Sequence, residues 1–473
     1  MIRRKYDILN PQDQEEEESA SQELAGLLEE YLRPLLMFLD TLLDKRLVRT
    51  FVGCCAAILR LRNPKQGLLL SELGAYLDSY SGLSRSAAAG TKRVGKLIRS
   101  RKWNAGQMEQ FLLAEAAKEV ERLKGLGKRV VALMDGSVIE KPESKSLEAT
   151  GAVISSKAKR VARSRFGLIF NPPLLRPIRV MGMEWTGTII TGLEGIPKLA
   201  VMRFWTTKGA YAAKLREKEE EVLCVLVRKF GQVLTYVFDR GYASGPWLEV
   251  LQKYRVTFII RWIKNHIFYN QEGKEKKIWQ IGFGKKYLAH KLIRDAHSGL
   301  QMTCDLWWTE VRHPHFTGSL YLVRARLQGK KVMYLITNER VITEEQAWGI
   351  FFSYKRRWQI EMSFRYAKCE LAMESPRVWS YEDRLKLFTI VLIVYSFLLY
   401  FLDEIHNDLR KMILRLKCHR TGKRYKEAIV PLYLLREAIS HLWNDCRPLL
   451  GLVLPPDLAT LQVLALFPSE KGS

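Results

Sequence analysis

Four polar side chains recur at helical spacing in the stretch SYKRRWQIEMSFRYAKCELAMESP: Tyr354, Arg357, Glu361 and Lys368. Thr343 begins a Thr-x-x-Gln capping box and Pro376 provides a stop, so the sequence predicts one helix over residues 344–374. At about 100° per residue the four side chains fall on one narrow stripe of that helix. A carboxylate between two cationic residues on such a stripe suits the binding of a metal ion and a phosphate group.

The predicted helix places this polar stripe in the middle of its apolar side. Five apolar residues flank the stripe: Ile360 and Phe364 on one side, and Phe351, Trp358 and Met362 on the other. The far side of the helix, which we expect to be solvated, carries four polar residues: Lys355, Arg356, Gln359 and Ser363. Because a polar row inside an apolar face is costly without a partner, we expect the stripe to face a functional site.

Two further carboxylates follow apolar runs that read as buried strands. Asp135 ends the run in ALMDGS, and Asp239 ends the run in YVFDRGY. Carboxylates at the ends of neighbouring strands converge at one edge of a sheet, where Glu361 from a crossing helix would complete the cluster. Three carboxylates suit hard divalent cations, so we expect Mg²⁺, in two ions, with Mn²⁺ as a substitute. Two such ions catalyse phosphoryl transfer by activating the attacking oxygen and neutralising the leaving one.

Each of these residues also has an ordinary structural interpretation. Asp135 precedes Gly136, and the Asp-Gly step is a common turn. Asp239 could form a local ion pair with Arg240, and Glu361 could be the i,i+4 partner of a helical arginine. The three residues together favour a functional site, because the ordinary interpretations would have to hold independently for all three.

The charge of the chain points to a polyanionic partner. Its 76 Lys and Arg against 50 Asp and Glu give 473 residues a net charge of +26. Thirteen Lys or Arg lie between Lys45 and Lys102 against two acids, which leaves +11 on this segment alone. Such an excess is typical of proteins that bind nucleic acid. We expect four residues of this segment to contact DNA in a helix-turn-helix-like unit: Lys92, Arg93, Lys96 and Arg99. The alternative is a generic helical bundle in which they form an ordinary solvated helix face.

Cysteine usage and hydropathy indicate a cytoplasmic protein. The seven Cys are scattered and form no C-x-x-C pair, which is typical of free thiols in a reducing compartment. No secretory signal is evident at the N-terminus. The uncharged run 387–402 is shorter than the roughly 20 residues that a membrane span needs. We therefore expect a buried helix there and no membrane association.

The changes of pattern along the chain predict a multidomain protein with an α/β core between helical ends. Six segments are expected: a mobile acidic tail at 1–20, a helical DNA-binding domain at 21–127, the first part of the core at 128–263, a β-rich insertion at 264–341, the catalytic helix of the core at 342–378, and a helical C-terminal region, where dimerisation is plausible, at 379–473.

The motifs together resemble those of a known family. Tyr354-x₂-Arg357-x₃-Glu361-x₆-Lys368 is similar to the YREK signature of DDE transposases of the insertion-sequence-four type. FDRGY at 238–242 resembles that group's motif around the second Asp, and MDGS at 134–137 the one around the first. The resemblance covers roughly 128–400 and implies an RNase H-like core that carries a β-strand insertion.

The resemblance also implies roles for individual residues. Asp135, Asp239 and Glu361 would be the catalytic, metal-binding triad. Four residues would contact the DNA: Tyr354, Arg357, Lys368 and, less directly, Arg240. In this family cleavage can pass through a hairpin, with a flipped base stacked on a Trp. Three residues are candidates for that Trp and the sequence does not choose among them: Trp262, Trp348 and Trp358.

The implied protein is a bacterial or archaeal transposase acting on the nucleoid. It would bind the terminal inverted repeats of an insertion sequence as a homodimer, cleave the double-stranded DNA ends, and join the 3′-OH to target DNA. Two alternatives stay open at this point. One is a catalytically inactive, transposase-derived DNA-binding protein, and the other is an RNase H-like nuclease without joining activity.

Overall fold

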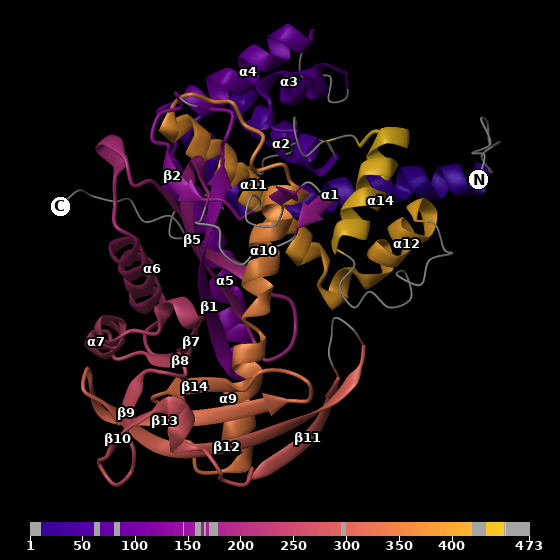
Figure 1. Cartoon of the computed structure of the whole chain (residues 1–473). Coiled ribbons are helices and arrows are strands. Elements are labelled where there is room, and N and C mark those ends of the chain that lie inside the picture. The colour runs from indigo at the N-terminus through magenta and orange to yellow at the C-terminus, as the bar shows by residue number, and fades with distance from the viewer. Residues whose placement is uncertain are drawn as a thin grey trace.

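The computed structural model in Figure 1 describes most of the chain. The described residues are 11–60, 67–79, 86–144, 146–156, 162–164, 167–169, 178–294, 299–418, 432–448 and 450. The C-terminal stretch after 450 and residues 1–10 of the expected tail lie outside them.

The chain folds into mixed α/β structure around one large sheet, as the sequence predicts. Five neighbouring strands form its centre, in the spatial order β6 (Lys198–Trp205), β5 (Arg179–Thr191), β1 (Val130–Glu140), β7 (Leu234–Phe238) and β8 (Thr257–Arg261). The first three form an antiparallel meander, whereas β7 runs parallel to β1 and β8 parallel to β7. β1 therefore lies in the middle, where an antiparallel and a parallel partner meet.

The two faces of this sheet bury two separate cores. Alternate residues of a strand point to opposite faces, so Ala132 and Met134 face one core while Val131 and Leu133 face the other. Helices α6 (Leu215–Phe230) and α7 (Gly245–Lys253) cover the first face. Helices α9 (Glu344–Lys355), α10 (Trp358–Cys369) and α11 (Tyr381–Phe401) cover the second.

The segment 264–341 is rich in strands and extends the same sheet. It contains β9 (Ile267–Tyr269), β10 (Glu275–Lys277), the short helix α8 (Ile278–Ile281), β11 (Ala289–Arg294), β12 (Gln301–His313), β13 (Phe316–Leu327) and β14 (Met333–Thr337). β14 pairs antiparallel with β8, so the insertion is hydrogen-bonded to the core. Figure 1 shows its strands wrapping around α9.

Smaller elements complete the described chain. They are β2 (Gly151–Ile154), which pairs with β5, the two-stranded β3 (Ala162–Ser164) and β4 (Gly167–Ile169), and the 3₁₀ helices η2 (Gly209–Tyr211), η3 (Arg240–Tyr242) and η4 (Glu404–His406).

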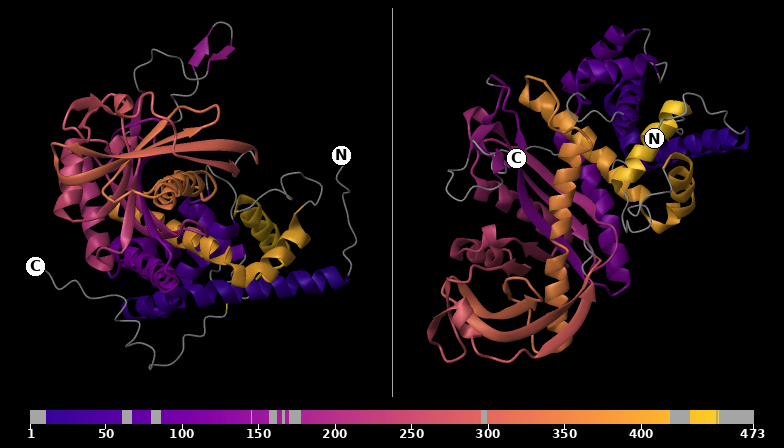
Figure 2. Two further views of the ribbon diagram at one scale, coloured as in Figure 1. Left: turned by 90° about the horizontal axis from the view of Figure 1, so that it is seen from below. Right: turned by 45° about the vertical axis from the view of Figure 1, so that its right-hand side comes forward.

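The helices from the two ends of the chain pack into one layer (Figure 2). They are α1 (Pro11–Leu42), α2 (Lys45–Arg60), α3 (Leu70–Ser79), α4 (Ala87–Arg99) and α5 (Ala105–Gly125) with α11, α12 (Asn407–Lys417) and α14 (Leu432–Asp445). The Tyr31 hydroxyl donates to Ser396 Oγ at 2.7 Å, and the buried Lys417 ammonium lies 2.6 Å from a Glu17 carboxylate oxygen. Residues 11–20, expected in a mobile tail, belong instead to α1.

Helix α11 joins this layer to the sheet. Among the described residues it is the one helix long and apolar enough to cross a membrane, and 89% of its most apolar window is buried inside the protein. The expected buried helix at 387–402 is therefore present, and it packs against α2, α4, α5, α10 and β6.

The single long helix predicted over 344–374 is wrong in one respect. The structure has two helices, α9 and α10, which meet in a tight turn at Arg356 and Arg357. There the N–H groups of Arg357 and Gln359 donate three residues back, to the carbonyls of Tyr354 and Arg356, as in a 3₁₀ helix. Such a turn advances about 120° per residue in place of about 100°, so α10 is rotated relative to the prediction.

Because α10 is rotated, residues predicted on its apolar flank are exposed and a residue predicted in solvent is buried. Trp358 and Met362, predicted on an apolar flank, are 58% and 42% exposed. Ser363, predicted in solvent, is buried; its hydroxyl donates to the Gln359 carbonyl at 2.9 Å and accepts from Tyr395 at 3.1 Å.

Helices α3 and α4 cross at two glycines, which gives a first prediction. A Cβ atom added at Gly90 would lie 2.1 Å from the Gly74 carbonyl oxygen. We expect Gly90→Ala to lower the free energy of unfolding by about 1–3 kcal/mol, because the helices must separate. Gly26→Ala is the matched helical control, since a Cβ there meets nothing within 4 Å among the described residues. It should be neutral or stabilising by up to about 1 kcal/mol. Equal melting curves for the two variants would refute this close crossing.

Candidate active site

Arg357 is the centre of the candidate site. Its guanidinium lies 3.1 Å from Asp135 Oδ2 on β1 and 2.5 Å from Glu361 Oε1, one turn further along α10. The side chain is almost buried. Burial lowers the pKa of Arg357, but four neighbours together raise it above its ordinary value: Tyr354, Asp239, Glu361 and Asp135. The structure thus brings two of the predicted carboxylates, Asp135 and Glu361, into ion pairs with one cation, and Asp239 acts on that cation electrostatically.

Asp135 owes its position to the unequal lengths of neighbouring strands. β1 was expected to end at Asp135, but it continues to Glu140, whereas the parallel partner β7 is paired only as far as Met134. Asp135 is therefore the first residue of β1 beyond the end of β7, with no strand on that side. Its Oδ1 accepts the N–H of Gly136 at 2.8 Å.

The charge state of Asp135 reflects a partly buried, crowded carboxylate. Burial raises the pKa of Asp135 to about 6, and the carboxylates of Asp239 and Glu361 add to the rise. The Arg357 guanidinium and the Gly136 N–H act in the opposite direction. Asp239, Glu361 and Arg357 therefore all act electrostatically on Asp135.

Asp239 follows β7 directly and precedes the 3₁₀ helix η3. It is half-buried, and its charge raises the pKa of both Asp135 and Tyr354. Its neighbour Arg240 is exposed to solvent. The end of β7 therefore presents Asp239 toward the cluster and offers Arg240 to anything that approaches from outside.

The residues of the cluster fit a hard divalent cation by donor type. All three carboxylates supply oxygen atoms, the donors that Mg²⁺ prefers. In the arrangement described here the Arg357 guanidinium lies between two of them. Accordingly, within the described ranges no group of three or more His, Cys, Asp or Glu is close enough to hold a metal ion. A cation at this site would have to take the place of the guanidinium.

Lys368 and Tyr354 lie at the two ends of the stripe that Arg357 and Glu361 share. The Lys368 ammonium donates to Ser137 Oγ at 2.9 Å and to the Val138 carbonyl at 3.3 Å, so it fastens α10 to β1 just past Asp135. Tyr354 is buried, with its ring centre 5.9 Å from the guanidinium carbon of Arg357. Burial raises the pKa of Tyr354. The structure therefore gathers the predicted stripe against β1.

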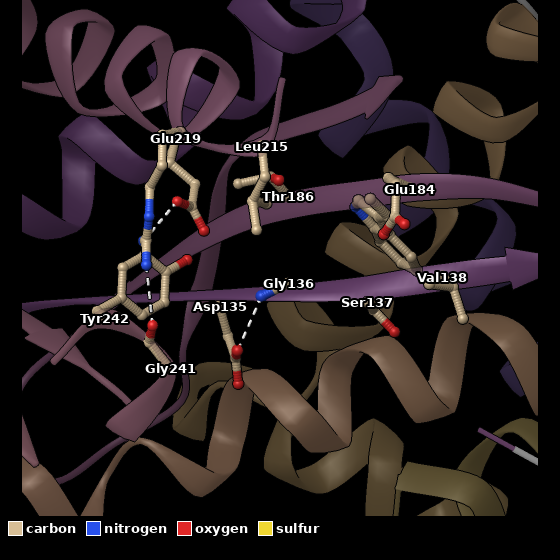
Figure 3. A pocket seen from close by; sticks show the side chains of 12 residues that line it. Asp135, Gly136, Ser137, Val138, Glu184, Thr186, Leu215, Glu219, Gly241 and Tyr242 are labelled. Atoms are coloured by element: carbon tan, nitrogen blue, oxygen red, sulfur yellow. Dashed lines mark hydrogen bonds and ion pairs between the residues drawn. The ribbon is translucent and has the colours of Figure 1, made fainter. Parts of the chain in front are cut away.

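A pocket of about 270 Å³ opens beside Asp135 on the α6 side of the sheet (Figure 3). Its wall includes Glu219, whose carboxylate lies 2.8 Å from Arg216, and Tyr242 of η3. Arg216 also donates to the Gly241 carbonyl at 2.9 Å. Burial raises the pKa of Glu219. Sequence analysis did not predict this wall, because Glu219 lies in the run EKEEE, which is typical of a solvated helix face.

The three candidate tryptophans separate by exposure. Trp262 and Trp348 are each 2% exposed, whereas Trp358, next to Arg357, is 58% exposed. An extrahelical base needs the open face of a ring. Of these three, Trp358 alone presents one.

The predicted N-terminal DNA contacts lie on α4, away from this cluster (Figure 1). Lys92, Lys96 and Arg99 are exposed. Arg93 is half-buried and donates to the backbone carbonyl of Arg46 at 3.1 Å. The four residues thus form a separate basic surface.

The contact between Arg357 and Asp135 gives a second prediction. In a double-mutant cycle, Arg357→Gln and Asp135→Asn should show a coupling of about 1–3 kcal/mol at about pH 7.5. Asp135 is ionised above its pKa of about 6 and neutral below it, so the coupling should shrink at about pH 5. Denaturant unfolding of the four proteins measures it.

The control cycle combines Arg357→Gln with Glu220→Gln, since Glu220 pairs with Lys253 on the outer surface. Its two effects should add within about 0.3–0.5 kcal/mol. A coupling between Arg357 and Asp135 no larger than this control, at either pH, would contradict the ion pair.

Comparisons with known proteins complete the description of the site. Residues 216–397 match the family described as the transposase DDE domain, a stretch that includes Asp239 and Glu361 but not Asp135. No curated protein matches the chain. A cryo-EM structure of the piggyBac transposase synaptic complex with hairpin DNA is similar at 11% identity and a TM-score of 0.39, over 97% of this chain and 86% of that one. A TM-score of that size does not establish a common fold. The match to the transposase DDE domain supports a DDE transposase.

Proposed function

We propose that this chain is a DDE transposase of the insertion-sequence-four type, and that it cleaves the ends of an insertion sequence and joins the 3′-OH ends to target DNA. The observation that carries the proposal is the pair of ion pairs that Arg357 forms with Asp135 and Glu361, with the charge of Asp239 acting on Asp135 and Arg357. Their strands and helix come from segments far apart in the sequence. Such a convergence of carboxylates is costly without a cationic ligand, which is typical of a functional site.

The order β6-β5-β1-β7-β8 supports an RNase H-like core. Asp135, Asp239 and Glu361 would hold two Mg²⁺ ions, with Mn²⁺ as a substitute. When bound, the ions supply activation of the attacking oxygen and neutralisation of the leaving one. The carboxylates fix where the scissile phosphate lies, because they are set on two strands and one helix of a packed core.

Arg357 has a second partner in this proposal. Its planar guanidinium can form two parallel hydrogen bonds to a phosphate, as it can to a carboxylate. With a DNA strand bound at the site, the guanidinium would leave Asp135 and Glu361 and bind a backbone phosphate. Lys368, about two turns beyond Glu361 on α10, and Arg240, exposed beside Asp239, would contact the same strand.

The exposed α4 surface would bind the terminal inverted repeats, and the enzyme would act as a homodimer because two ends must be brought together. We place it in the cytoplasm of a bacterium or archaeon, on the nucleoid. No observation specifically favours the alternative, a nuclease without joining activity. Incubation of the protein with a labelled DNA end and a plasmid distinguishes the two activities, since a transposase yields joined products.

The triad gives the third prediction. Glu361→Ala should abolish cleavage of a DNA end in Mg²⁺ and leave binding of that end nearly unchanged, since the carboxylate is a metal ligand and not a phosphate contact. Glu370→Ala removes a carboxylate at the C-terminal end of the same helix and serves as the control. Gel assays of cleavage and binding on the same substrate give both readings. Cleavage by Glu361→Ala at the control rate would remove the catalytic assignment.

Trp358 gives the fourth prediction. If its ring stacks on an extrahelical base, Trp358→Ala should slow end cleavage by about 5- to 150-fold, the equivalent of about 1–3 kcal/mol per stacked base. Thermal stability should change little, because the ring is exposed. Trp379→Ala, at another Trp with 61% exposure, is the matched control and should cleave normally. Equal rates for both variants would exclude Trp358 from the reaction.

A further inference from the structure

The turn that follows Asp239 is too short to hold its own conformation. Two backbone hydrogen bonds close η3: the Tyr242 N–H donates to the Asp239 carbonyl at 3.1 Å, and the Ala243 N–H donates to the Arg240 carbonyl at 3.2 Å. Hydrogen bonds in a 3₁₀ turn have poor geometry. The Asp239 side chain makes no capping bond to this turn. The direction of its carboxylate therefore depends on contacts that other elements make with η3.

Arg216 of α6 makes such contacts. Its Nη2 donates to the Gly241 carbonyl at 2.9 Å, and its Nη1 lies 2.8 Å from Glu219 Oε2. The guanidinium carbon lies 5.1 Å from the ring centre of Tyr242 and 5.3 Å from that of Trp247 on α7. Figure 3 shows Glu219, Gly241 and Tyr242 together on one side of the pocket. Because a planar guanidinium binds through its edge and stacks through its face, one side chain connects α6, η3 and α7.

Three aromatic rings anchor both ends of the turn beneath Arg216. Phe238 directly precedes Asp239, and Tyr242 is the last residue of η3. Together with Trp247 they form a buried cluster whose ring centres lie 5.0 to 5.6 Å apart. Aromatic pairs at such distances stabilise a fold beyond the area they bury. The backbone on both sides of Asp239 is thus anchored in the core.

Glu219 is the buried acid of α6. The residue is 3% exposed, whereas the side chains of the ion pair between Lys218 and Glu221 on the same helix are 26% and 47% exposed. Burial raises the pKa of Glu219, and the charge of Arg216 counteracts the rise. Because a desolvated carboxylate is costly without a cationic partner, this pair favours one orientation of the Arg216 guanidinium.

We propose that Arg216 and Glu219 are a positioning pair for the proposed metal ligand Asp239. They act on Asp239 through the Gly241 carbonyl and the Tyr242 ring, without contact to the reacting phosphate. The groups that orient a metal ligand matter almost as much as the ligand, and their loss typically costs about 10- to 100-fold in metal affinity or activity. This inference rests on the proposed function for the ions that Asp239 would hold.

The exposure of Arg216 allows one competing role. Its side chain is 45% exposed, so a DNA phosphate could bind it directly. The two roles change different quantities. A phosphate contact contributes to DNA affinity, whereas a positioning residue changes ion binding at unchanged DNA affinity.

Two variants of the full chain test the pair, each with a matched control on α6. Arg216→Lys keeps a positive charge beside Glu219, which protects the fold, but a single ammonium lacks the planar fork that reaches two partners. Arg228→Lys makes the same change at an exposed position near the end of the helix. Glu219→Ala removes the buried carboxylate, and Glu221→Ala removes an exposed one.

Hydrogen exchange without DNA or metal measures the turn itself. Arg216→Lys and Glu219→Ala should speed the exchange of the Tyr242 and Ala243 amides several-fold, because η3 opens more often. The two controls should leave these rates unchanged. Exchange at the wild-type rate in the test variants would overturn the proposal. Faster exchange throughout the chain would overturn it too, because it would show a general loss of stability.

Ion binding measures the consequence for the proposed site. With a DNA end bound, titration of Mn²⁺ followed by the EPR signal of the free ion should show an affinity weakened by about 10- to 100-fold in both test variants. The Mg²⁺ concentration for half-maximal cleavage should rise in parallel, and DNA affinity measured by fluorescence anisotropy should stay the same. Glu219→Gln, which still offers Arg216 an oxygen acceptor, should recover most of the loss.

The outcomes distinguish the positioning pair from the proposed function. Weaker Mn²⁺ binding in the test variants supports the pair even if the unaltered chain cleaves no DNA end, a result that would remove the transposase chemistry. Unchanged Mn²⁺ binding, or none by the unaltered chain, overturns the positioning role whether or not DNA is cleaved. Weaker DNA binding at unchanged Mn²⁺ affinity would also overturn it and would assign Arg216 to a phosphate.

Discussion

The repulsion among three carboxylates, and its compensation by one buried guanidinium, is the constraint around which this structure is organised. Asp135 is mostly buried, and burial together with the charges of Asp239 and Glu361 raises its pKa, which a nearby cation counteracts. Arg357 supplies that charge from the same helix as Glu361. The cluster is therefore held together by the charge of one side chain.

The sheet and the two helices above it set the geometry of that cluster. β1 extends one residue and more beyond its pairing with β7, so no strand covers Asp135 on that side. Asp239 and a substrate can approach it there. The tight turn between α9 and α10 points Arg357 inward and leaves Trp358 in solvent. Lys368 then fastens α10 to β1 beyond Asp135. Each of these features is held by packing on both faces of the sheet, which fixes the geometry of the cluster.

The ends of the chain meet behind this core and connect it to the basic surface of α4. The first and last helices form one layer, through buried contacts such as the one between Glu17 and Lys417. α11 passes from α10 into this layer, and its Lys386 reaches the end of α4. The basic surface of α4 and the carboxylate cluster at α10 are thus parts of one packed body.

The sequence alone determined what depends on local pattern. Apolar runs predicted the strands that carry Asp135 and Asp239, and helical spacing predicted the stripe from Tyr354 to Lys368, because periods of 2 and 3.6 residues record which side of an element is buried. Tertiary structure decided the rest. The length of β1 beyond β7, the 3₁₀ turn that rotated α10, the exposure of Trp358, the pocket wall at Glu219 and the convergence of Arg46 with Arg93 all depend on contacts between residues far apart in the chain. Local periodicity does not encode contacts between residues far apart in the chain, because these contacts form only when the elements pack together.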